Sequence, residues 1–270
     1  MNEIKIAVVQ MNVVSNKMKN IEVAVKYIAD AKRQGADIVV LPEMFCCPYK
    51  TSNFPIYAEL EGGEAYEKLS AAAKNNSVYL VAGSMPEIDA SGKVFNTSYV
   101  FDRDGKKIGK HRKVHLFDIQ VEDGQFFKES DTLSEGNEAT VFDTEFGKIG
   151  LAICYDFRFP ELSRLMVDRG AQIIIVPGAF NMTTGPAHWE VLFRSRAIDN
   201  QVFTVGVAPA RNTEAAYVSY GHSIIVSPWG RVVAQLGENE GMLVRTINLD
   251  EVQKIRNELP LLAHRRKDIY

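Results

Sequence analysis

The chain has 270 residues, of which 46% are hydrophobic and 24% are charged, the proportions of an ordinary globular protein. These values exclude the collagen-like, disordered and low-complexity classes. The 31 basic and 34 acidic residues give a net charge of −3, and neither sign forms a long block, so no nucleic-acid partner is expected. Because no Gly/Ser-rich or Pro-rich linker divides the sequence, we expect one domain over residues 1–270.

The start of the chain and its cysteines indicate the compartment. Met1–Gln10 has a broken strand pattern that carries Glu3, unlike a signal peptide, and no stretch approaches the ~18 uninterrupted apolar residues of a membrane helix. We therefore expect a cytoplasmic protein with no membrane partner. The three cysteines are too few for a disulfide scaffold, and adjacent Cys46 and Cys47 do not match metal-ligand spacing. At least one thiol is a candidate for chemical reactivity.

The sequence contains a faint internal repeat. Gly35–Glu43 (GADIVVLPE) resembles Gly170–Gly178 (GAQIIIVPG), and each reads as a helix stop, a buried strand and a proline. The similarity extends outward, so that each half reads strand, helix, strand, helix, strand, strand. The expected strands are 5–9, 38–41, 78–83 and 97–101 in the first half, and 148–152, 173–176, 202–206 and 222–226 in the second.

The helices between these strands are apolar on one side. The predicted buried faces consist of Ile21, Val25 and Ile28 in the first half, and of Leu162, Leu165 and Met166 in the second. One-sided helices and strands with continuous apolar runs favour two sheets packed face to face and covered outside by helices. We predict an α/β protein, a four-layer αββα sandwich of two half-repeats. The alternative is a single doubly wound sheet, or a repeat that is a coincidence between two buried strands.

A cysteine follows one predicted strand directly. The strand Ile149–Ile153 runs into Cys154, and Pro160 then opens a helix that Gly170 ends. The thiol therefore lies at the carboxyl end of a strand, where α/β sheets present reactive groups to ligands. One interpretation is a nucleophile, and the other is an inert buried cysteine that packs as a small hydrophobe.

A carboxylate occupies what we expect to be the equivalent strand end in the other half. Glu43 follows the buried run Ile38–Leu41 and Pro42. Beside a dry pocket its pKa would rise, which suits a group that takes and returns protons near neutral pH. A helix cap or a surface ion pair is the alternative.

Two further charged residues could join a site. Lys113 lies in a basic cluster over residues 110–116 (KHRKVHL), which usually indicates a solvated loop. An ammonium in a dry pocket could instead stabilise a thiolate and the oxyanion of a tetrahedral intermediate. Glu129 lies among aromatic residues in Phe126–Ser130, and alone it resembles a loop charge.

A histidine pair raises the question of a metal. His111 and His115 have the i, i+4 spacing that places two imidazoles on one helical face for zinc. No glutamate lies between them, and Asp118 is only a loose third ligand. We expect neither a metal nor another cofactor.

Three motifs occur in order along the chain: LPEMF around Glu43, KHRKVHLFD around Lys113 and CYDFRFPEL around Cys154. With these motifs the sequence resembles the nitrilase, or carbon-nitrogen hydrolase, superfamily over nearly its whole length. The resemblance implies that Glu43, Lys113 and Cys154 form a catalytic triad and that Glu129 is the second glutamate of the site. It also implies an αββα fold, assembly as a homodimer and a small-molecule amide as substrate.

Within the superfamily, residues 178–190 (GAFNMTTGPAHWE) resemble the omega-amidase branch most. The resemblance implies an amidohydrolase that forms a cysteine thioester and converts 2-oxoglutaramate or 2-oxosuccinamate to the 2-oxo dicarboxylate plus ammonia. One alternative is a deaminated glutathione amidase, since that branch shares much of the second half. Others are a carbon-nitrogen hydrolase that acts on an N-carbamoyl amine or a nitrile, and a catalytically silent dimeric binding module.

An omega-amide substrate carries a carboxylate at its far end, which a cation or a hydroxyl must meet, and a bidentate arginine is the strongest option. Arg194 and Arg196 cannot share one helical face, so at most one of them should point into a pocket. The resemblance also places the backbone N–H of Tyr155 at the oxyanion. The expected substrate-binding residues are Tyr49, Tyr155, Arg158, Phe180, Asn181 and Arg211. The tail, residues 261–270, is a candidate docking segment for a partner.

Overall fold

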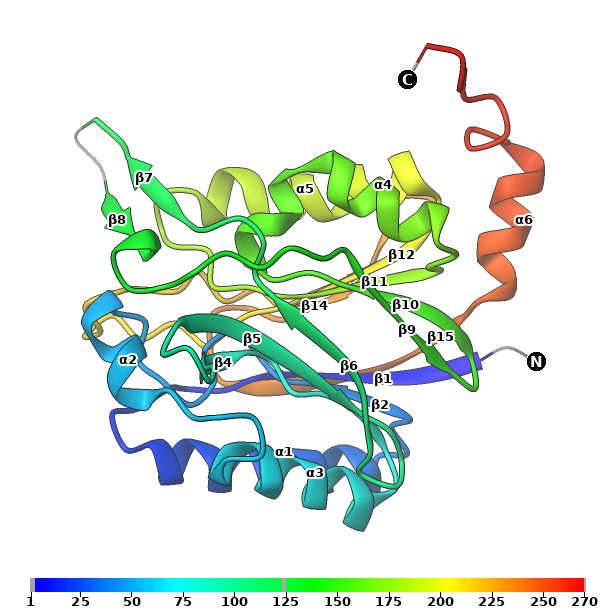
Figure 1. The fold of residues 1–270 in the computed structure, drawn as a ribbon. Helices are drawn as coiled ribbons and strands as arrows, with labels where there is room; N and C mark the ends of the chain where they lie inside the picture. The colour runs from blue at the N-terminus through cyan, green and yellow to red at the C-terminus, as the bar shows by residue number, and fades with distance from the viewer. Residues whose placement is uncertain (1–2, 123–124, 270) are drawn as a thin grey trace.

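The computed structural model describes residues 3–122 and 125–269. Two β-sheets lie face to face between two layers of helices (Figure 1). Helices α1 (Lys17–Arg33) and α3 (Glu64–Asn76) cover the outside of one sheet, and α4 (Pro160–Asp168) and α5 (Gly185–Asn200) cover the outside of the other. The predicted αββα sandwich is confirmed, and a single doubly wound sheet is excluded.

The first sheet has seven strands in the order β15-β1-β2-β3-β5-β4, with β6 also paired to β5. Its strands are β1 (Glu3–Gln10), β2 (Ile38–Val40), β3 (Tyr79–Val81), β4 (Met85–Ile88), β5 (Val94–Phe101), β6 (Lys107–Arg112) and β15 (Gly241–Asn248). The second sheet has six strands in the order β14-β13-β12-β11-β10-β9. Its strands are β9 (Thr140–Thr144), β10 (Gly147–Leu151), β11 (Ile173–Pro177), β12 (Phe203–Val207), β13 (Ile224–Val226) and β14 (Val232–Gln235).

Short elements complete the described chain. A separate two-stranded hairpin projects from the sandwich (Figure 1). These elements are β7 (Asp118–Gln120), β8 (Phe126–Lys128), α2 (Phe54–Tyr57), α6 (Asp250–Glu258) and the 3-10 turns η1 (Thr51–Asn53), η2 (Glu129–Asp131) and η3 (Cys154–Arg158). None of the helices in the described part of the chain is long and apolar enough to span a membrane.

The two sheets repeat one topology. In the first, β1, β2 and β3 are parallel, with β15 antiparallel to β1 and β5 antiparallel to β3. In the second, β10, β11 and β12 are parallel, with β9 antiparallel to β10 and β13 antiparallel to β12. The sequence repeat is therefore architectural and not a coincidence.

The continuous apolar runs are explained by burial on both faces of each sheet. Along β1, Ile4, Ile6 and Val8 pack into the core between the sheets, whereas Ala7 and Val9 pack into the core under α1 and α3. Successive side chains of a strand point to opposite faces, so both faces need apolar residues when both are covered.

One predicted helix face is partly wrong. Leu162 and Met166 are buried on α4 as expected, but Leu165 is 49% exposed. Ser163 and Val167 are also buried, since residues four apart share a helix face. The buried face is therefore centred on the 162/166 and 163/167 rows, and Leu165 lies toward the solvent. On α1, Ile21 and Ile28 are buried and Val25 packs beside them.

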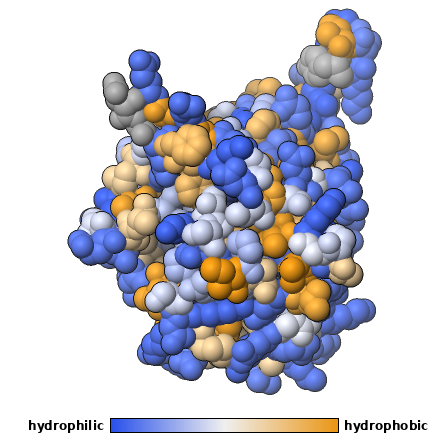
Figure 2. Space-filling view, turned by 60° about the vertical axis from the view of Figure 1, so that its left-hand side comes forward, coloured by the Kyte–Doolittle hydropathy of each residue, from blue (hydrophilic) through white to orange (hydrophobic). Residues whose placement is uncertain are grey.

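One face of the molecule is mainly hydrophilic. On the face drawn in Figure 2, hydrophobic residues lie in small separate groups among hydrophilic ones. The described segment that follows α6 projects from the body of the sandwich (Figure 1). Tyr270, the last residue of the predicted docking tail, lies outside the described residues.

Candidate active site

Segments from both sheets meet at one buried cluster of polar side chains. Glu43 lies three residues after β2, Lys113 directly follows β6, Cys154 begins the turn η3 after β10, and Glu129 begins η2. The side chains of Glu43, Lys113 and Glu129 are fully buried, and Cys154 is 4% exposed. The structure thus brings together the four residues that the sequence singled out.

The Lys113 ammonium lies between two carboxylates. Its Nζ is 3.0 Å from Glu43 Oε1 and 3.0 Å from Glu129 Oε1. Burial alone would lower the pKa of Lys113, but the charges of Glu129 and Glu43 outweigh it and raise the pKa above its usual value. The side chain therefore stays a cation and offsets part of the negative charge of the cluster.

Glu43 is held by donors on both of its oxygens. Oε2 accepts the backbone N–H of Ala179 at 2.7 Å, and Oε1 accepts the side-chain amide of Asn96 at 2.9 Å. Burial raises the pKa of Glu43, the Lys113 charge opposes that rise, and the Cys154 thiol is near enough to interact with the same carboxylate. Glu43 is therefore placed as the candidate acceptor of the thiol proton.

Cys154 has an unusual backbone. Its φ is +48°, in the left-handed region that residues with a Cβ rarely adopt. Burial raises the pKa of the thiol well above its usual value, Glu43 adds to that rise, and Lys113 opposes it. Gly178 packs beside this turn, because a Cβ there would lie 3.4 Å from Cys154 Cα. The thiol is therefore protonated at rest and is held in a strained turn.

Glu129 is not a loop charge. Its Oε2 accepts the backbone N–H of Phe117 at 2.7 Å, in addition to the contact with Lys113. The Tyr49 hydroxyl lies 2.6 Å from Glu129 Oε1 and 3.2 Å from Glu43 Oε1. The structure therefore places Tyr49, expected at the substrate carboxylate, between the two glutamates.

Two residues of the site were not predicted. Asn96 is fully buried in β5 and donates to Glu43, and the ring of Tyr217 packs against that of Tyr49 at a tilt of 32°, with ring centroids 4.5 Å apart. The run Asn-Thr-Ser at 96–98, polar residues within an apolar strand, was a usable signal for Asn96. Tyr217 lies in an irregular segment and had no comparable signal.

Arg158 is the predicted arginine that lies near enough to Cys154 for a thiolate charge there to act on it. Its guanidinium lies 4.5 Å from the ring centroid of Phe180 and 3.0 Å from His188 Nδ1. The Tyr155 ring is also near, with its centroid 5.8 Å from the guanidinium carbon. Three of the predicted substrate-binding residues therefore form one cationic and aromatic group beside the thiol.

The other predicted arginines hold backbone carbonyls. Arg194 donates to the carbonyl of Gly230 at 2.9 Å, Arg196 to that of Arg158 at 3.1 Å, and Arg211 to that of Tyr220 at 2.9 Å. These guanidinium groups order the chain around α5 and the loop before β13.

Asn181 lies in the loop four residues before α5, where its Oδ1 accepts the backbone N–H of Thr184 at 2.9 Å. Its Nδ2 contacts the side chain of Gln125. Asn181 therefore links the loop before α5 to the segment that joins β7 and β8.

The two histidines do not lie on one helical face. His111 lies in strand β6 and His115 in the following loop, so the i, i+4 spacing does not arise from a helix. Both imidazoles contact Asp156, at 2.9 Å each. Asp118 accepts the backbone N–H of Ser130 instead. Within residues 3–122 and 125–269, no group of three or more His, Cys, Asp or Glu residues could hold a metal ion.

The expected equivalence of Glu43 and Cys154 is also wrong. Glu43 follows β2 and Cys154 follows β10, but in the repeated topology β10 corresponds to β1 and β2 corresponds to β11. The position that matches Glu43 is Gly178, as the repeated sequence segments indicate.

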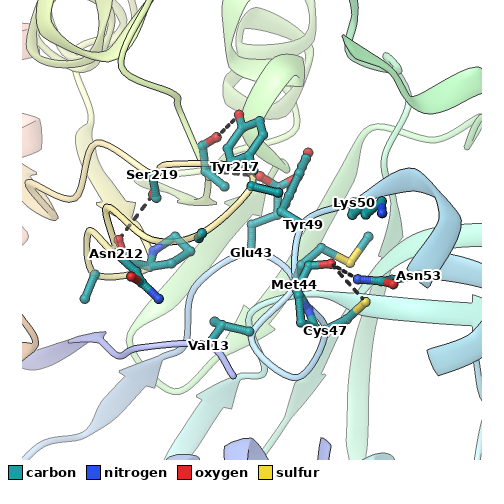
Figure 3. A pocket seen from close by; sticks show the side chains of 16 residues that line it. Val13, Glu43, Met44, Cys47, Tyr49, Lys50, Asn53, Asn212, Tyr217 and Ser219 are labelled. Carbon is teal, nitrogen blue, oxygen red and sulfur yellow. Dashed lines mark hydrogen bonds between the residues drawn. The ribbon is translucent and has the colours of Figure 1, made fainter. Parts of the chain in front are cut away.

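A cavity of about 130 Å³ borders the cluster. Figure 3 shows Glu43 in its wall, with Tyr49 and Tyr217 on one side and Val13 on the other. Residues of the 44–53 and 209–219 segments, together with Ala179, complete the wall. The residues from the two segments are Met44, Cys47, Pro48, Lys50, Asn53, Pro209, Ala210, Asn212, Ala215, Ala216 and Ser219.

Comparison with known proteins identifies the class. The family described as "Carbon-nitrogen hydrolase" matches residues 5–257, and the chain belongs to this family. It is an enzyme that hydrolyses carbon–nitrogen bonds of amides.

Full-length relatives and solved structures support this assignment. The omega-amidase NIT2 of Mus musculus is 48% identical over 270 residues, which are 100% of this chain and 98% of the mouse protein. Nit3 of Saccharomyces cerevisiae, a member of branch 10 of the nitrilase superfamily, is 43% identical with a TM-score of 0.91 over 98% of this chain and 97% of its own. A mutant of the amidase from Nesterenkonia sp. AN1 carries the acetamide moiety of fluoroacetamide on its active-site cysteine, and matches with 25% identity and a TM-score of 0.82 over 98% of this chain and 95% of its own.

Proposed function

We propose that this enzyme is an omega-amidase that converts 2-oxoglutaramate or 2-oxosuccinamate to the 2-oxo dicarboxylate and ammonia through a thioester on Cys154. The observation that carries the mechanism is a buried thiol that interacts with the buried carboxylate of Glu43, which itself lies 3.0 Å from the Lys113 ammonium. The substrate class is supported by full-length relatives, 48% and 50% identical, that are named omega-amidases.

In the first half-reaction, Glu43 accepts the thiol proton and the Cys154 sulfur bonds to the amide carbon. Lys113 and the backbone N–H of Tyr155 stabilise the oxyanion. The carbon–nitrogen bond then breaks, and protonated Glu43 returns its proton to the nitrogen, which leaves as ammonia. A raised Glu43 pKa supports both transfers, because a carboxyl group works best as base and then acid when its pKa is near the working pH.

In the second half-reaction, water replaces ammonia. Glu43 accepts a proton from this water, the hydroxide adds to the thioester carbon, and the sulfur leaves and regains its proton. Glu129 keeps Lys113 in place in both half-reactions, since its carboxylate contacts the ammonium and is itself fixed by the Phe117 N–H.

The far carboxylate of the substrate binds Arg158 in this proposal. Burial lowers the pKa of Arg158, which reflects a guanidinium that is partly removed from water and in contact with His188 and aromatic rings. An incoming substrate carboxylate would supply a negative charge to this group. The guanidinium lies over the aromatic rings of Phe180 and Tyr155, which hold it in place.

The deciding experiment mixes the enzyme with 2-oxoglutaramate, quenches it in acid and weighs the intact protein by mass spectrometry. We expect a mass increase equal to the 2-oxoglutaryl group on the wild type, and no adduct and no ammonia release with Cys154→Ala. Cys46→Ala is the matched control, because Cys46 is buried in the core under α1. Wild-type turnover by Cys154→Ala would disprove the mechanism.

The substrate class has its own test. Ammonia release should be fastest from 2-oxoglutaramate and 2-oxosuccinamate, compared with glutamine, deaminated glutathione and N-carbamoyl compounds. Arg158→Met should lower kcat/KM for 2-oxo acid amides about 10- to 100-fold, the value of a charge-assisted hydrogen bond, and spare neutral amides. Arg194→Met is the control, since Arg194 holds a backbone carbonyl. Equal loss with neutral amides would reject Arg158 as the anchor.

We also propose a cytoplasmic homodimer of single-domain chains. The three cysteines are free, as expected in a reducing compartment. Large apolar side chains are exposed on α4, on α5 and in the projecting tail, which supports burial of this region against a second copy. They include Leu165, Val191, Ile198, Leu261 and Ile269. Light scattering should give twice the chain mass, and a monomer at micromolar concentration would disprove the assembly.

A further inference from the structure

One buried carboxylate at the site has no role in the steps above. Asp156 lies two residues after Cys154, within the same turn η3, and is fully buried. Its Oδ2 accepts the backbone N–H of Ile153 at 3.1 Å. One oxygen of Asp156 is therefore fixed to the residue that immediately precedes the thiol.

The other oxygen is fixed to the segment that carries the ammonium. Oδ1 of Asp156 accepts the backbone N–H groups of Val114 at 3.1 Å and His115 at 2.8 Å, the two residues that follow Lys113. Lys113 follows a strand of the seven-stranded sheet and Cys154 follows a strand of the six-stranded sheet. A single carboxylate therefore links the two sheets at the point where their reactive side chains meet.

Two imidazoles hold this carboxylate in turn. His111 Nε2 lies 2.9 Å from Asp156 Oδ2, and His115 Nδ1 lies 2.9 Å from Oδ1. His111 Nδ1 lies 2.9 Å from Thr140 Oγ1 in the six-stranded sheet, and the His115 ring stacks on Phe159 at 3.7 Å. Because an ionised carboxylate only accepts hydrogen bonds, each histidine carries a proton on the nitrogen that faces Asp156.

The charge state of Asp156 agrees with this arrangement. Burial would raise its pKa, but the hydrogen bonds from His111 and His115 hold the pKa well below its usual range. The group is therefore an anion with five donors around it, and it is not placed to exchange protons with the thiol.

We propose that Asp156, held by His111 and His115, is the positioning residue that sets the distance and orientation of Cys154 relative to Lys113. The left-handed backbone of Cys154 needs such support, since a strained conformation persists only where its surroundings over-determine it. This role explains the histidine pair without a metal. It rests on the proposal that Cys154 is the nucleophile and Lys113 the oxyanion donor.

The first test replaces the acceptor. In Asp156→Asn an amide NH₂ takes the place of one oxygen, so the donors that faced that oxygen lose their acceptor. We expect kcat to fall about 100-fold or more, the effect of a shift of about 1 Å in reacting groups, with KM changed much less. Asp102→Asn is the matched control, because Asp102 also accepts backbone N–H groups, but in the turn between β5 and β6.

The second test uses a pair of substitutions at His115, which is partly exposed and so tolerates change. His115→Phe keeps a ring to stack on Phe159 but removes the donor to Asp156, and should lower kcat about 10-fold, the value of one charge-assisted hydrogen bond. His115→Asn removes the ring but keeps a donor of similar reach, and should recover most of the lost rate. The opposite order would show that ring stacking matters and would overturn the proposal.

Acid-quenched mass spectrometry separates positioning from loss of structure. A positioning role predicts that all Asp156→Asn molecules acylate Cys154, but slowly. If instead only a fraction acylates, at the wild-type rate, Asp156 is merely structural and the proposal fails. Cys154→Ala is measured in parallel: wild-type turnover there rejects the proposed mechanism, whereas an inactive Cys154→Ala together with a wild-type rate in Asp156→Asn rejects the positioning role alone.

Discussion

The two halves of the molecule share a strand order but carry different chemistry. Each sheet has three central parallel strands with an antiparallel strand on either side. The first half supplies Glu43, Lys113 and Glu129, the charged groups of the site, and the second half supplies the thiol of Cys154. A repeated scaffold therefore does not imply a repeated site.

The register of the strands shows which positions correspond. Ile6 of β1 pairs with Ile38, and Ile149 of β10 pairs with Ile173. Counting forward by five residues from Ile6 and from Ile149, Cys154 corresponds to Met11, a fully buried core residue. Counting from the partner strands, Glu43 corresponds to Gly178. The comparison teaches that the topology creates several similar strand ends and that the side chains placed there decide which of them react.

The largest expected effect is the loss of the proposed base. Glu43→Gln cannot accept a proton, so kcat should fall about 10³-fold, within the range typical of general acid–base groups. Steady-state ammonia release measures the loss. Glu61→Gln, a change to a surface partner of Lys107 and Lys110, should stay near the wild-type rate. A fall of less than about tenfold for Glu43→Gln would show that the strand end of the first half does not supply the base.

The next effect concerns the ammonium. Lys113→Met should lower the rate of acyl-enzyme formation about 10²- to 10³-fold, the cost of removing one oxyanion donor. It should also lower the midpoint of urea unfolding, because Glu43 and Glu129 lose their shared cation in a buried site. Lys110→Met, which alters a partly exposed ion pair, is the control. Rapid-quench acylation kinetics that match the wild type would contradict the assignment.

A smaller effect on stability and acylation is expected at Gly178, the position that corresponds to Glu43. A Cβ on Gly178 would lie 3.2 Å from Trp189 and 3.4 Å from Cys154 Cα. Gly178→Ala should therefore destabilise the protein by about 1–3 kcal/mol through overpacking and slow acylation of the thiol. Gly237→Ala is the comparison, since a Cβ there meets nothing within 4 Å. Equal unfolding midpoints for the two variants would mean that the close packing at Gly178 is relieved at no cost.

Substitution of Met11, the position that corresponds to Cys154, should have little effect on catalysis. Met11→Leu conserves volume in the core and should cost less than about 1.5 kcal/mol, with kcat unchanged. Cys154→Ser at the corresponding position should remove turnover. Calorimetry and ammonia release together check the pair, and a large loss of activity in Met11→Leu would break the distinction between the two strand ends.

The smallest expected effect is on stability in acid. The pKa of Asp156 is lowered in the folded state, so the group stabilises the fold above the pKa of an unfolded aspartate, about 3.9, and this contribution is lost as pH falls below that value. Urea unfolding of the wild type between about pH 5 and 3 should show this loss, and Asp156→Asn should show a shallower dependence. Parallel slopes would mean that Asp156 does not titrate abnormally.

The sequence predicted the features that are local. The strand and proline before Glu43, and the strand before Cys154, are continuous segments, so their strand ends could be placed from apolar runs alone. The order of strands and helices in each half could also be predicted, since the sequence repeat extends over several strands and helices. These features account for the sandwich and for Glu43 and Cys154, whereas Lys113 was assigned to the site only by the resemblance of its motif to the family.

Features that depend on distant segments were missed or misread. Asn96 meets Glu43 only because β5 packs beside β3, and Tyr217 reaches Tyr49 from a segment in the other half of the chain. The role of the histidine pair was also missed, since its i, i+4 spacing occurs here where a strand ends in a loop. Residue spacing alone does not distinguish a helical pair from such a strand-and-loop pair. What the pair does depends on Asp156, which both rings contact.

The pairing of the first strand with the last has a consequence for synthesis. Glu3–Gln10 forms eight residue pairs with Gly241–Asn248, so β1 must wait for a strand that is made much later. During translation this edge of β1 stays open while the residues between the two strands emerge, and an open edge can pair with other chains. A nascent chain stalled before residue 241 should thus depend on chaperones, and release of residues 241–270 should close the sheet.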